Sequence, residues 1–206
     1  MLKIFGKTSS INVRKVLWTC EELGLTYQLQ AYGSGTDNRL DTDYFLQLNP
    51  NALVPVIDDG GEILWESNTI CRYLANKQQR EDLLPFSAMP RARVEMWMDW
   101  QATELNNAWR YAFMATVRHS SAHQDARLIE QSVQAWNQHM AILDRQLQKT
   151  AAYVSGAHFS LADVVLGLSL NRWKRSPITH GSFPALERYF ELLCQRSAYR
   201  TFIEFP

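Results

Sequence analysis

The chain has few cysteines and no long apolar run. Its 206 residues include three cysteines, Cys20, Cys71 and Cys194, which are far apart and show neither a CxxC motif nor zinc-ligand spacing. We therefore expect reduced thiols and a cytoplasmic protein. No stretch approaches the roughly 18 consecutive apolar residues of a membrane helix, and the N-terminal lysine is not followed by an apolar signal region. Membrane spanning and secretion are both disfavoured.

The chain also has no excess of charge of either sign. Its 21 basic residues balance 21 acidic ones, so nothing directs it toward nucleic acid or anionic membranes. The histidines show no metal-ligand spacing, so we expect no metal and no permanently bound cofactor. These five histidines are His119, His123, His139, His158 and His180.

Two apolar runs, residues 54–57 and 62–65, flank the sequence Asp58-Asp59-Gly60-Gly61. Glycines supply the positive φ angles of a tight turn, so this segment predicts a β-hairpin. Pro55 lacks an N–H and is unusual at the start of a strand. A cis Val54-Pro55 bond would resolve the conflict and would turn the Val54 backbone N–H and C=O outward, where they can pair with an extended peptide.

A helix is predicted directly after the hairpin. Ser67 precedes the helical run as a natural N-cap, and Glu66 stands just outside it. The first N–H groups of a helix are unpaired and carry partial positive charge, which suits a carboxylate ligand. Together with the outward Val54 backbone, this helix start predicts a site that clamps a peptide.

Periodicity divides the chain into an α/β part followed by an all-helical part. The second part contains Ser160-Leu161-Ala162-Asp163, a capping box with Asp in place of Glu at the third helical position, so Asp163 is expected to be structural. The first part is predicted as a strand at 2–5, a helix from 11 ending at Gly24, a strand at 27–32, a helix at 43–48, the hairpin and a last helix. The second part is predicted as helices from Pro90 to about 114, at 125–149, after 160 and at 186–193.

Val54-Pro55, the hairpin and Trp65-Glu66-Ser67-Asn68-Thr69-Ile70 resemble the glutathione-binding motif of the glutathione transferase family. The whole chain is similar to serine-type, theta-like bacterial members. The resemblance implies a thioredoxin-like domain at 1–78 (βαβ then ββα), a linker at 79–88 and a C-terminal helical bundle at 89–206 with an electrophile pocket. It also implies glutathione as co-substrate and a homodimer, with Trp97, Asp99 and Trp100 near the contact.

The resemblance also assigns residues to glutathione. Val54 and Pro55 would hold its backbone, Ser67 would donate to its γ-glutamyl carboxylate, and Glu66 would accept from its α-ammonium. Members of the family often carry His or Lys before the proline for the glycyl carboxylate, and Ala52 and Leu53 depart from this pattern. Arg39 is a candidate replacement.

The first loop is expected to be the reactive site. Ser10-Ile11-Asn12-Val13-Arg14 resembles the Ser-x-Pro-Cys-Arg motif of serine-type members, which makes Ser10 the hydrogen-bond donor to the glutathione thiolate. Asn12, in the place of the proline, can direct its amide to the same sulfur. Two alternatives stay open: that Ser10 is only a helix cap, and that Ser9 or Thr8 takes its role.

The electrophile pocket is expected where the helix around residues 109–114 faces Ser10. Its candidate residues are Arg110, Tyr111, Met114 and Arg118.

The sequence thus predicts a glutathione transferase that conjugates small electrophiles, such as halogenated or activated aromatic compounds, in a detoxification role. Two alternatives remain: a glutathione-dependent disulfide reductase or peroxidase, and a non-catalytic glutathione- or ligand-binding protein on the same fold.

Overall fold

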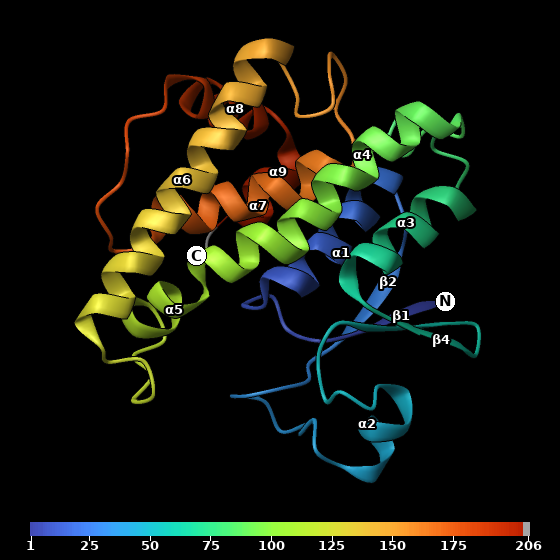
Figure 1. The fold of residues 1–206 in the computed structure, drawn as a ribbon. Coiled ribbons are helices and arrows are strands. Elements are labelled where there is room, and N and C mark those ends of the chain that lie inside the picture. Colours follow the sequence, from blue (N-terminus) through green and yellow to red (C-terminus); the bar gives the residue numbers. More distant parts are fainter. Residues whose placement is uncertain (204–206) are drawn as a thin grey trace. The chain divides into compact units, whose positions relative to one another are not determined.

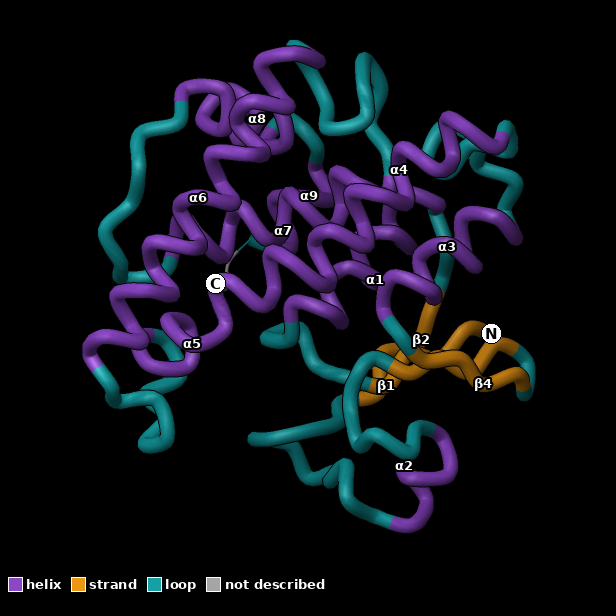
Figure 2. The backbone as a smooth tube through the Cα atoms, viewed as in Figure 1, coloured by secondary structure: helices purple, strands orange, loops and turns teal. Residues whose placement is uncertain are grey.

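The structure is a computed structural model that describes residues 1–203, and the chain divides into two compact units at Pro85 and Phe86. The division falls inside the segment predicted as a linker. The first unit holds all the strands of the described chain, and the second is built from helices (Figures 1 and 2). The predicted fold class, a thioredoxin-like domain followed by a helical domain, is confirmed.

The first unit is a four-stranded mixed sheet with three helices. The strands lie in the order β2-β1-β3-β4, with β1 parallel to β2 and antiparallel to β3, and β3 antiparallel to β4. This is the predicted βαβ unit joined to a hairpin and a helix. The elements are β1 (Leu2–Phe5), α1 (Ile11–Leu23), β2 (Tyr27–Gln30), α2 (Asp43–Leu48), β3 (Val56–Asp59), β4 (Glu62–Trp65) and α3 (Ser67–Lys77).

Two strand boundaries differ from the prediction. The second strand ends at Gln30, two residues before the expected Tyr32, whose ring instead stacks on Phe45 at 5.1 Å. The first hairpin strand begins at Val56 and not at Val54. Pro55 has no N–H to give to the sheet, so regular pairing starts only after it.

The two faces of this sheet are covered by different helices. Phe5 and Val56 pair across the sheet and form a buried cluster with Phe45 of α2. Their neighbours Ile4 and Ile57 point the other way, because side chains alternate along a strand, and both are fully buried. In Figure 2, α1 and α3 lie on one side of the sheet and α2 lies on the other.

The carboxylate of Asp59, at the end of β3, joins the hairpin to α3. Asp59 accepts hydrogen bonds from the Tyr73 hydroxyl at 2.7 Å and from the Lys77 ammonium at 2.5 Å. The hydrogen bonds from Lys77 and then Tyr73 hold the pKa of the Asp59 carboxyl below its ordinary value. Gly60 and Gly61 make the turn with φ of 71° and 101°, as predicted. The two hydrogen bonds of Asp59 hold the second half of α3 at the end of β3.

The second unit contains the remaining helices of the described chain. The expected helix from Pro90 to about residue 114 is interrupted by a π-helical turn, η1, which the sequence did not predict. The terminal helix α9 was also not predicted. The elements are α4 (Ala88–Trp100), η1 (Gln101–Leu105), α5 (Asn106–Thr116), α6 (Ala126–Thr150), α7 (Leu161–Arg175), α8 (Pro184–Cys194) and α9 (Ser197–Phe202).

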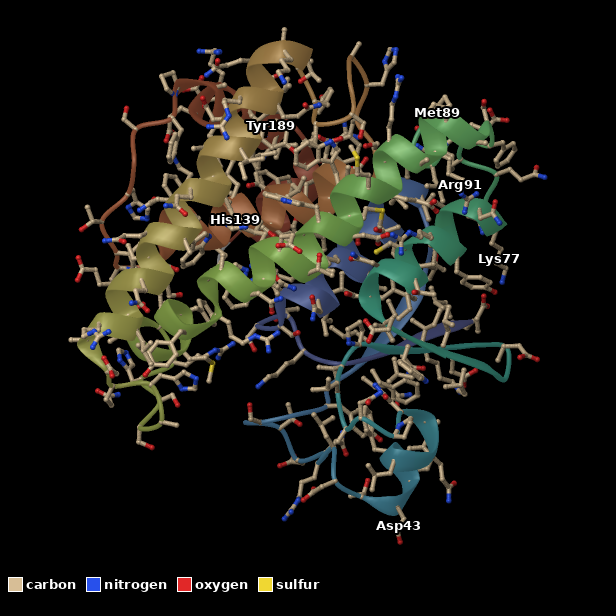
Figure 3. The ribbon with its side chains drawn as sticks, in the orientation of Figure 1. Asp43, Lys77, Met89, Arg91, His139 and Tyr189 are labelled. Carbon is tan, nitrogen blue, oxygen red and sulfur yellow. The ribbon has the colours of Figure 1, made fainter. Side chains whose placement is uncertain are left out.

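Two buried carboxylates organise the helices of this unit. Asp144 of α6 accepts from the N–H groups of Ala185 and Leu186 at 2.8 and 3.0 Å, so it caps the start of α8 from another helix. Asp163 completes the predicted capping box with Ser160 and is structural, as expected. It also accepts from the Tyr189 hydroxyl of α8 at 2.8 Å, and Tyr189 is labelled in Figure 3.

Burial raises the pKa of Asp163 to about 6, against the opposing hydrogen bonds from Val154, Tyr189 and Ser160. In the unfolded chain the carboxyl releases its proton near the ordinary value of 3.8. Between these two values the folded state binds the proton more tightly. The stability that protonated Asp163 contributes is therefore present at pH below about 4 and is lost as the pH rises through about 6.

The variant Asp163→Asn does not titrate, so it isolates this effect. We expect the free energy of unfolding of the wild type, relative to that of the variant, to fall by roughly 1–3 kcal/mol between pH of about 4 and about 6. Denaturant unfolding of both proteins across this range measures the difference. A wild-type advantage that grows with pH over the same range would contradict the raised pKa.

Candidate functional site

The sheet brings three of the predicted segments to one end. Phe5 is opposite Val56, and Val56 is opposite Trp65. Extending each strand by one residue places Gly6, Pro55 and Glu66 beside one another at the same end of the sheet. The first loop, the proline turn and the start of α3 are therefore neighbours, as the peptide clamp requires.

Gly6 allows the close approach of these segments. A Cβ atom on Gly6 would lie 2.4 Å from Cγ2 of Val13 in α1 and 3.4 Å from Cβ of Val54. Its φ of 155° is also one that residues with side chains rarely adopt. The glycine therefore lets both α1 and the Val54 segment pack against the end of β1.

The Val54-Pro55 peptide bond is cis, which confirms the prediction. The Val54 side chain packs inward against the cluster of Phe5, Phe45 and Val56. Within the described chain, the Val54 N–H and C=O have no hydrogen-bond partner. Because backbone donors and acceptors are nearly always paired, with protein, water or ligand, these two groups are suited to an extended peptide.

Asn49 fixes the approach to this turn, and the sequence reading missed it. Its side chain is buried and donates to the Leu53 carbonyl at 2.8 Å, while its Oδ1 accepts from the Asn51 N–H at 3.0 Å. The Asn-Pro-Asn sequence was the available signal, because Asn side chains often bond backbone groups two residues further on. Asn49 thus holds the residue directly before Val54.

The start of α3 differs from the prediction by one residue. Glu66 is the N-cap and Ser67 is the first helical residue, so the prediction of Ser67 as the cap was wrong. The shift is possible because Glu66 adopts a φ of 75°, which is strained for a residue with a side chain and costs on the order of 1–3 kcal/mol. Strain of this kind often accompanies a functional position.

Ser67 presents two hydrogen-bond donors at this helix start. The first helical bond runs from the Ile70 N–H to the Glu66 carbonyl at 2.9 Å, which leaves the Ser67 N–H without an intrahelical acceptor. Its hydroxyl makes no hydrogen bond within residues 1–203. The residue as a whole is 7% exposed. A carboxylate placed here would receive both donors and the favourable end of the helix dipole.

Ser10 occupies the N-cap position of α1 without acting as a side-chain cap. Its N–H donates to the Lys7 carbonyl and its own carbonyl accepts from the Arg14 N–H, each at 3.0 Å. Its hydroxyl makes no capping bond. Ser10 therefore stands at the cap position while its hydroxyl stays available to a ligand. The hydroxyls of Thr8 and Ser9 and the Asn12 amide likewise show no bond within the described residues.

A hollow of about 360 Å³ lies between the loop that follows β2 and the residues before the proline turn. Arg39 lines it together with Ala52. The Arg39 guanidinium is bound by Asp41 through two bonds, at 2.8 and 2.5 Å, and its side chain is 75% exposed. Those bonds lower the pKa of the Asp41 carboxyl. A carboxylate ligand would have to share or displace Asp41.

The residues predicted for the electrophile pocket lie on and just after α5. Arg110 is exposed and Met114 is half-buried. The Tyr111 ring meets His123 edge-on at 4.8 Å, and its hydroxyl accepts from the Asp125 N–H at 3.3 Å. The Arg118 guanidinium lies 5.5 Å from the centre of the Phe113 ring. Tyr111 and Arg118 thus have partners within their own unit.

Two kinds of feature do not occur in the part of the chain that the structure describes. No three His, Cys, Asp or Glu side chains come together in a way that could hold a metal ion. No helix there is both long enough and apolar enough to cross a membrane.

Comparisons with known proteins show the family of the chain. Residues 9–77 match the family model of the glutathione S-transferase N-terminal domain. The chain is 36% identical to glutathione S-transferase GstB of Escherichia coli K12, over 100% of this chain and 99% of that protein. It is 29% identical to glutathione S-transferase 3 of Zea mays, over 97% of this chain and 91% of that one.

A solved structure is similar over the same length. It is the theta class glutathione S-transferase of Xanthomonas axonopodis pv. citri with glutathione bound. The TM-score is 0.91 at 33% identity, covering 100% of this chain and 98% of that one. A thioredoxin-like unit followed by a helical unit is the architecture of the glutathione transferases. The chain belongs to the glutathione S-transferase family.

Proposed function

We propose that this protein is a glutathione transferase that binds glutathione as the thiolate and conjugates it to small electrophiles, such as halogenated or activated aromatic compounds. The observation that carries the proposal is the uncommitted Ser10 hydroxyl, next to the sheet end where the unpaired Val54 backbone and the open start of α3 also lie.

In the proposed complex the tripeptide lies along the end of the sheet. Its γ-glutamyl carboxylate accepts from the N–H and hydroxyl of Ser67, and its α-ammonium pairs with Glu66. The Val54 N–H and C=O bond its cysteinyl backbone, next to Pro55. Its glycyl carboxylate enters the hollow beside Arg39, which then exchanges Asp41 for the ligand. The solved glutathione-bound relative from Xanthomonas supports glutathione as the ligand class.

Ser10 supplies the chemistry by favouring the thiolate. A free thiol of this type has a pKa of roughly 8.5, so little is ionised at neutral pH. Lowering the pKa by about two units requires roughly 2.7 kcal/mol of preferential stabilisation. One hydroxyl donor and the start of α1 are of the right size to provide it. The sulfur then attacks the electrophilic carbon, a C–S bond forms, and the leaving group departs with the bonding electrons.

We propose that the electrophile is met by Arg110, Tyr111, Met114 and Arg118 of the helical unit, because an aromatic ring, a thioether and two cations suit a flat compound with an anionic substituent. We also propose a cytoplasmic role in detoxification. The free thiols of Cys20, Cys71 and Cys194 support a reducing compartment.

The role of Ser10 is tested by Ser10→Ala. Turnover with a chlorinated nitrobenzene is expected to fall roughly 100-fold, because the thiolate loses its donor. Ultraviolet titration of the thiolate in the glutathione complex should show the thiol pKa rising toward its free value. Ser9→Ala, which removes a neighbouring hydroxyl, is the matched control and should leave both quantities close to wild type.

The titration also separates the alternatives. An unchanged thiol pKa in Ser10→Ala, with a raised one in Ser9→Ala, would transfer the role to Ser9. If the wild-type complex shows no shift at all, the non-catalytic binding protein is correct. A shifted thiol together with turnover of disulfides or peroxides, and none of aromatic halides, would identify the reductase or peroxidase.

The role of Ser67 is tested by Ser67→Ala. The variant loses a hydroxyl donor to a buried carboxylate, which is worth roughly 1.5–3 kcal/mol, so the Kd for glutathione should rise roughly 10- to 150-fold. Isothermal titration calorimetry measures the Kd. Thr69→Ala, an exposed residue of the same helical turn, is the control and should bind as the wild type does. Equal affinities in Ser67→Ala and wild type would place the γ-glutamyl group elsewhere.

We propose that the protein is a homodimer through α4. Trp97 and Trp100 pack edge-on at 5.2 Å, and Trp100 lies 5.7 Å from His139 of α6, so both rings have partners within their unit. Two methionines of α4, at 64% and 56% exposure, are the more open apolar side chains. These are Met89, labelled in Figure 3, and Met96. An exposed apolar patch favours a partner surface.

Light scattering of the wild type is expected to give twice the chain mass of 23.8 kDa. Met96→Glu should shift the protein to the monomer, because a charge enters an apolar contact. Leu128→Glu is the control, since Leu128 is an exposed apolar residue of α6 at 42% exposure. A wild-type monomer, or equal dissociation in both variants, would rule out this contact.

A further inference from the structure

We propose that Lys7 is a positioning residue that fixes the loop carrying Ser10 by binding Ser34 in the loop that follows β2. The inference deepens the proposed function and rests on it. Lys7 would act through Ser10 and would not touch the substrate.

Lys7 is bonded to Ser10 and to a distant loop at the same time. Its carbonyl accepts from the Ser10 N–H at 3.0 Å, closing a turn over Lys7 to Ser10. Its ammonium donates to the hydroxyl oxygen of Ser34 at 2.8 Å and to the Ser34 carbonyl. The two residues are 27 positions apart in the sequence. One side chain thus ties the turn that holds Ser10 to the segment beyond β2.

The loop of residues 6–10 makes few other hydrogen bonds to the neighbouring segments. Gly6 is paired by its backbone with Gln30 at 2.9 Å and with Tyr32 at 3.3 Å. Thr8 and Ser9 make no hydrogen bond that ties the turn to another segment of the described chain. In the described part of the chain, the bonds from Lys7 to Ser34 are therefore the ones that join residues 7–10 to a segment other than the helix α1 that follows.

The partner loop is itself held in shape. The Gly33 N–H donates to the Asn38 carbonyl at 2.9 Å, and the Gly33 carbonyl accepts from the N–H and the hydroxyl of Thr36 at 3.0 and 2.8 Å. Ser34 therefore sits on a closed turn and not on a loose strand of chain. The same turn forms part of the 360 Å³ hollow beside Arg39. Lys7 links the reactive loop to the wall of that hollow.

This link matters because a hydroxyl stabilises a thiolate only over a short range. Hydrogen bonds weaken steeply when the donor moves away from the acceptor or out of line. Small displacements of a catalytic group, on the order of 1 Å, can cost up to about 100-fold in rate. If Lys7 no longer holds the turn, Ser10 keeps its hydroxyl but samples positions in which it misses the sulfur.

The test is Lys7→Met, which keeps the length and apolar stem of the side chain and removes the ammonium. We expect kcat to fall roughly 5- to 20-fold with less than about a threefold change in the Kd for glutathione. The thiol pKa of the bound glutathione should rise by about 0.5–1. Lys7→Arg retains donors of similar reach and should restore most of the activity. Lys3→Met is the control and should behave as the wild type does, because Lys3 of β1 pairs with Asp58 of β3 at 3.0 Å and, within residues 1–203, makes no bond to the loop of Ser10.

A double variant decides whether Lys7 acts through Ser10. In the Ser10→Ala background, adding Lys7→Met should change neither kcat nor the thiol pKa further, because the group being positioned is gone. Effects that simply multiply would overturn the proposal, as would a Lys7→Met variant equal to wild type. A large rise in the glutathione Kd at unchanged kcat would also overturn it, since Lys7 would then bind the ligand directly.

A second variant covers the case in which Lys7→Met does not fold, and the wild type tests the proposed function separately. Ser34→Ala removes one of the two acceptors of Lys7, and it should give a smaller change of the same kind if Lys7→Met does not fold. An unchanged Ser34→Ala would then count against the proposal. The proposed function fails separately: in that case the wild type itself shows no shifted glutathione thiol and no conjugation, whatever Lys7 does.

Discussion

The unpaired backbone of Val54, beside the cis proline, is the feature on which the rest of the site depends. Backbone donors and acceptors at a sheet end normally find partners. Here the side chain of Val54 is held in the cluster with Phe5 and Phe45, and Asn49 occupies the Leu53 carbonyl just before it. The protein therefore fixes the direction of Val54 without using its N–H and C=O. We propose that the backbone of a tripeptide is the partner of those two groups.

The other parts of the site are arranged around this edge by strand register. Because Phe5, Val56 and Trp65 pair across three strands, the loop of Ser10 and the start of α3 arrive at the same sheet end. Glu66 has a strained backbone there, with a φ of 75°, and Ser67 is the first helical residue. The N–H and hydroxyl of Ser67 are therefore available to a ligand. Because one fold can host several functions, the proposed chemistry depends on the residues of the first loop, Ser10 above all.

Much of this was predictable from the sequence, because it depends on local signals. Gly60-Gly61, the unusual position of Pro55 and the capping box at Asp163 each act within a few residues, and all three predictions are confirmed. The elements and their order followed from periodicity. The dimer, the electrophile pocket and the ligand contacts of the site residues remain proposals.

Some of the features that the sequence did not predict depend on distant partners. Asp144 caps α8 through the N–H of Ala185, 41 positions later, and Lys7 binds Ser34, 27 positions later. Other features are local: Arg39, the candidate for the glycyl carboxylate, is paired with Asp41, two positions away. The cap at Glu66 was missed because a positive φ is rarely assigned to glutamate. In each case the residue type allowed several environments, and only the folded chain selects one.

The most direct test of the account is a crystal structure of the protein with glutathione bound. We predict that the Val54 N–H and C=O pair with the cysteinyl backbone, that the γ-glutamyl carboxylate lies on Ser67, and that the Ser10 hydroxyl is about 3 Å from the sulfur. A tripeptide bound away from this sheet end, or a sulfur that faces no donor of the first loop, would contradict it.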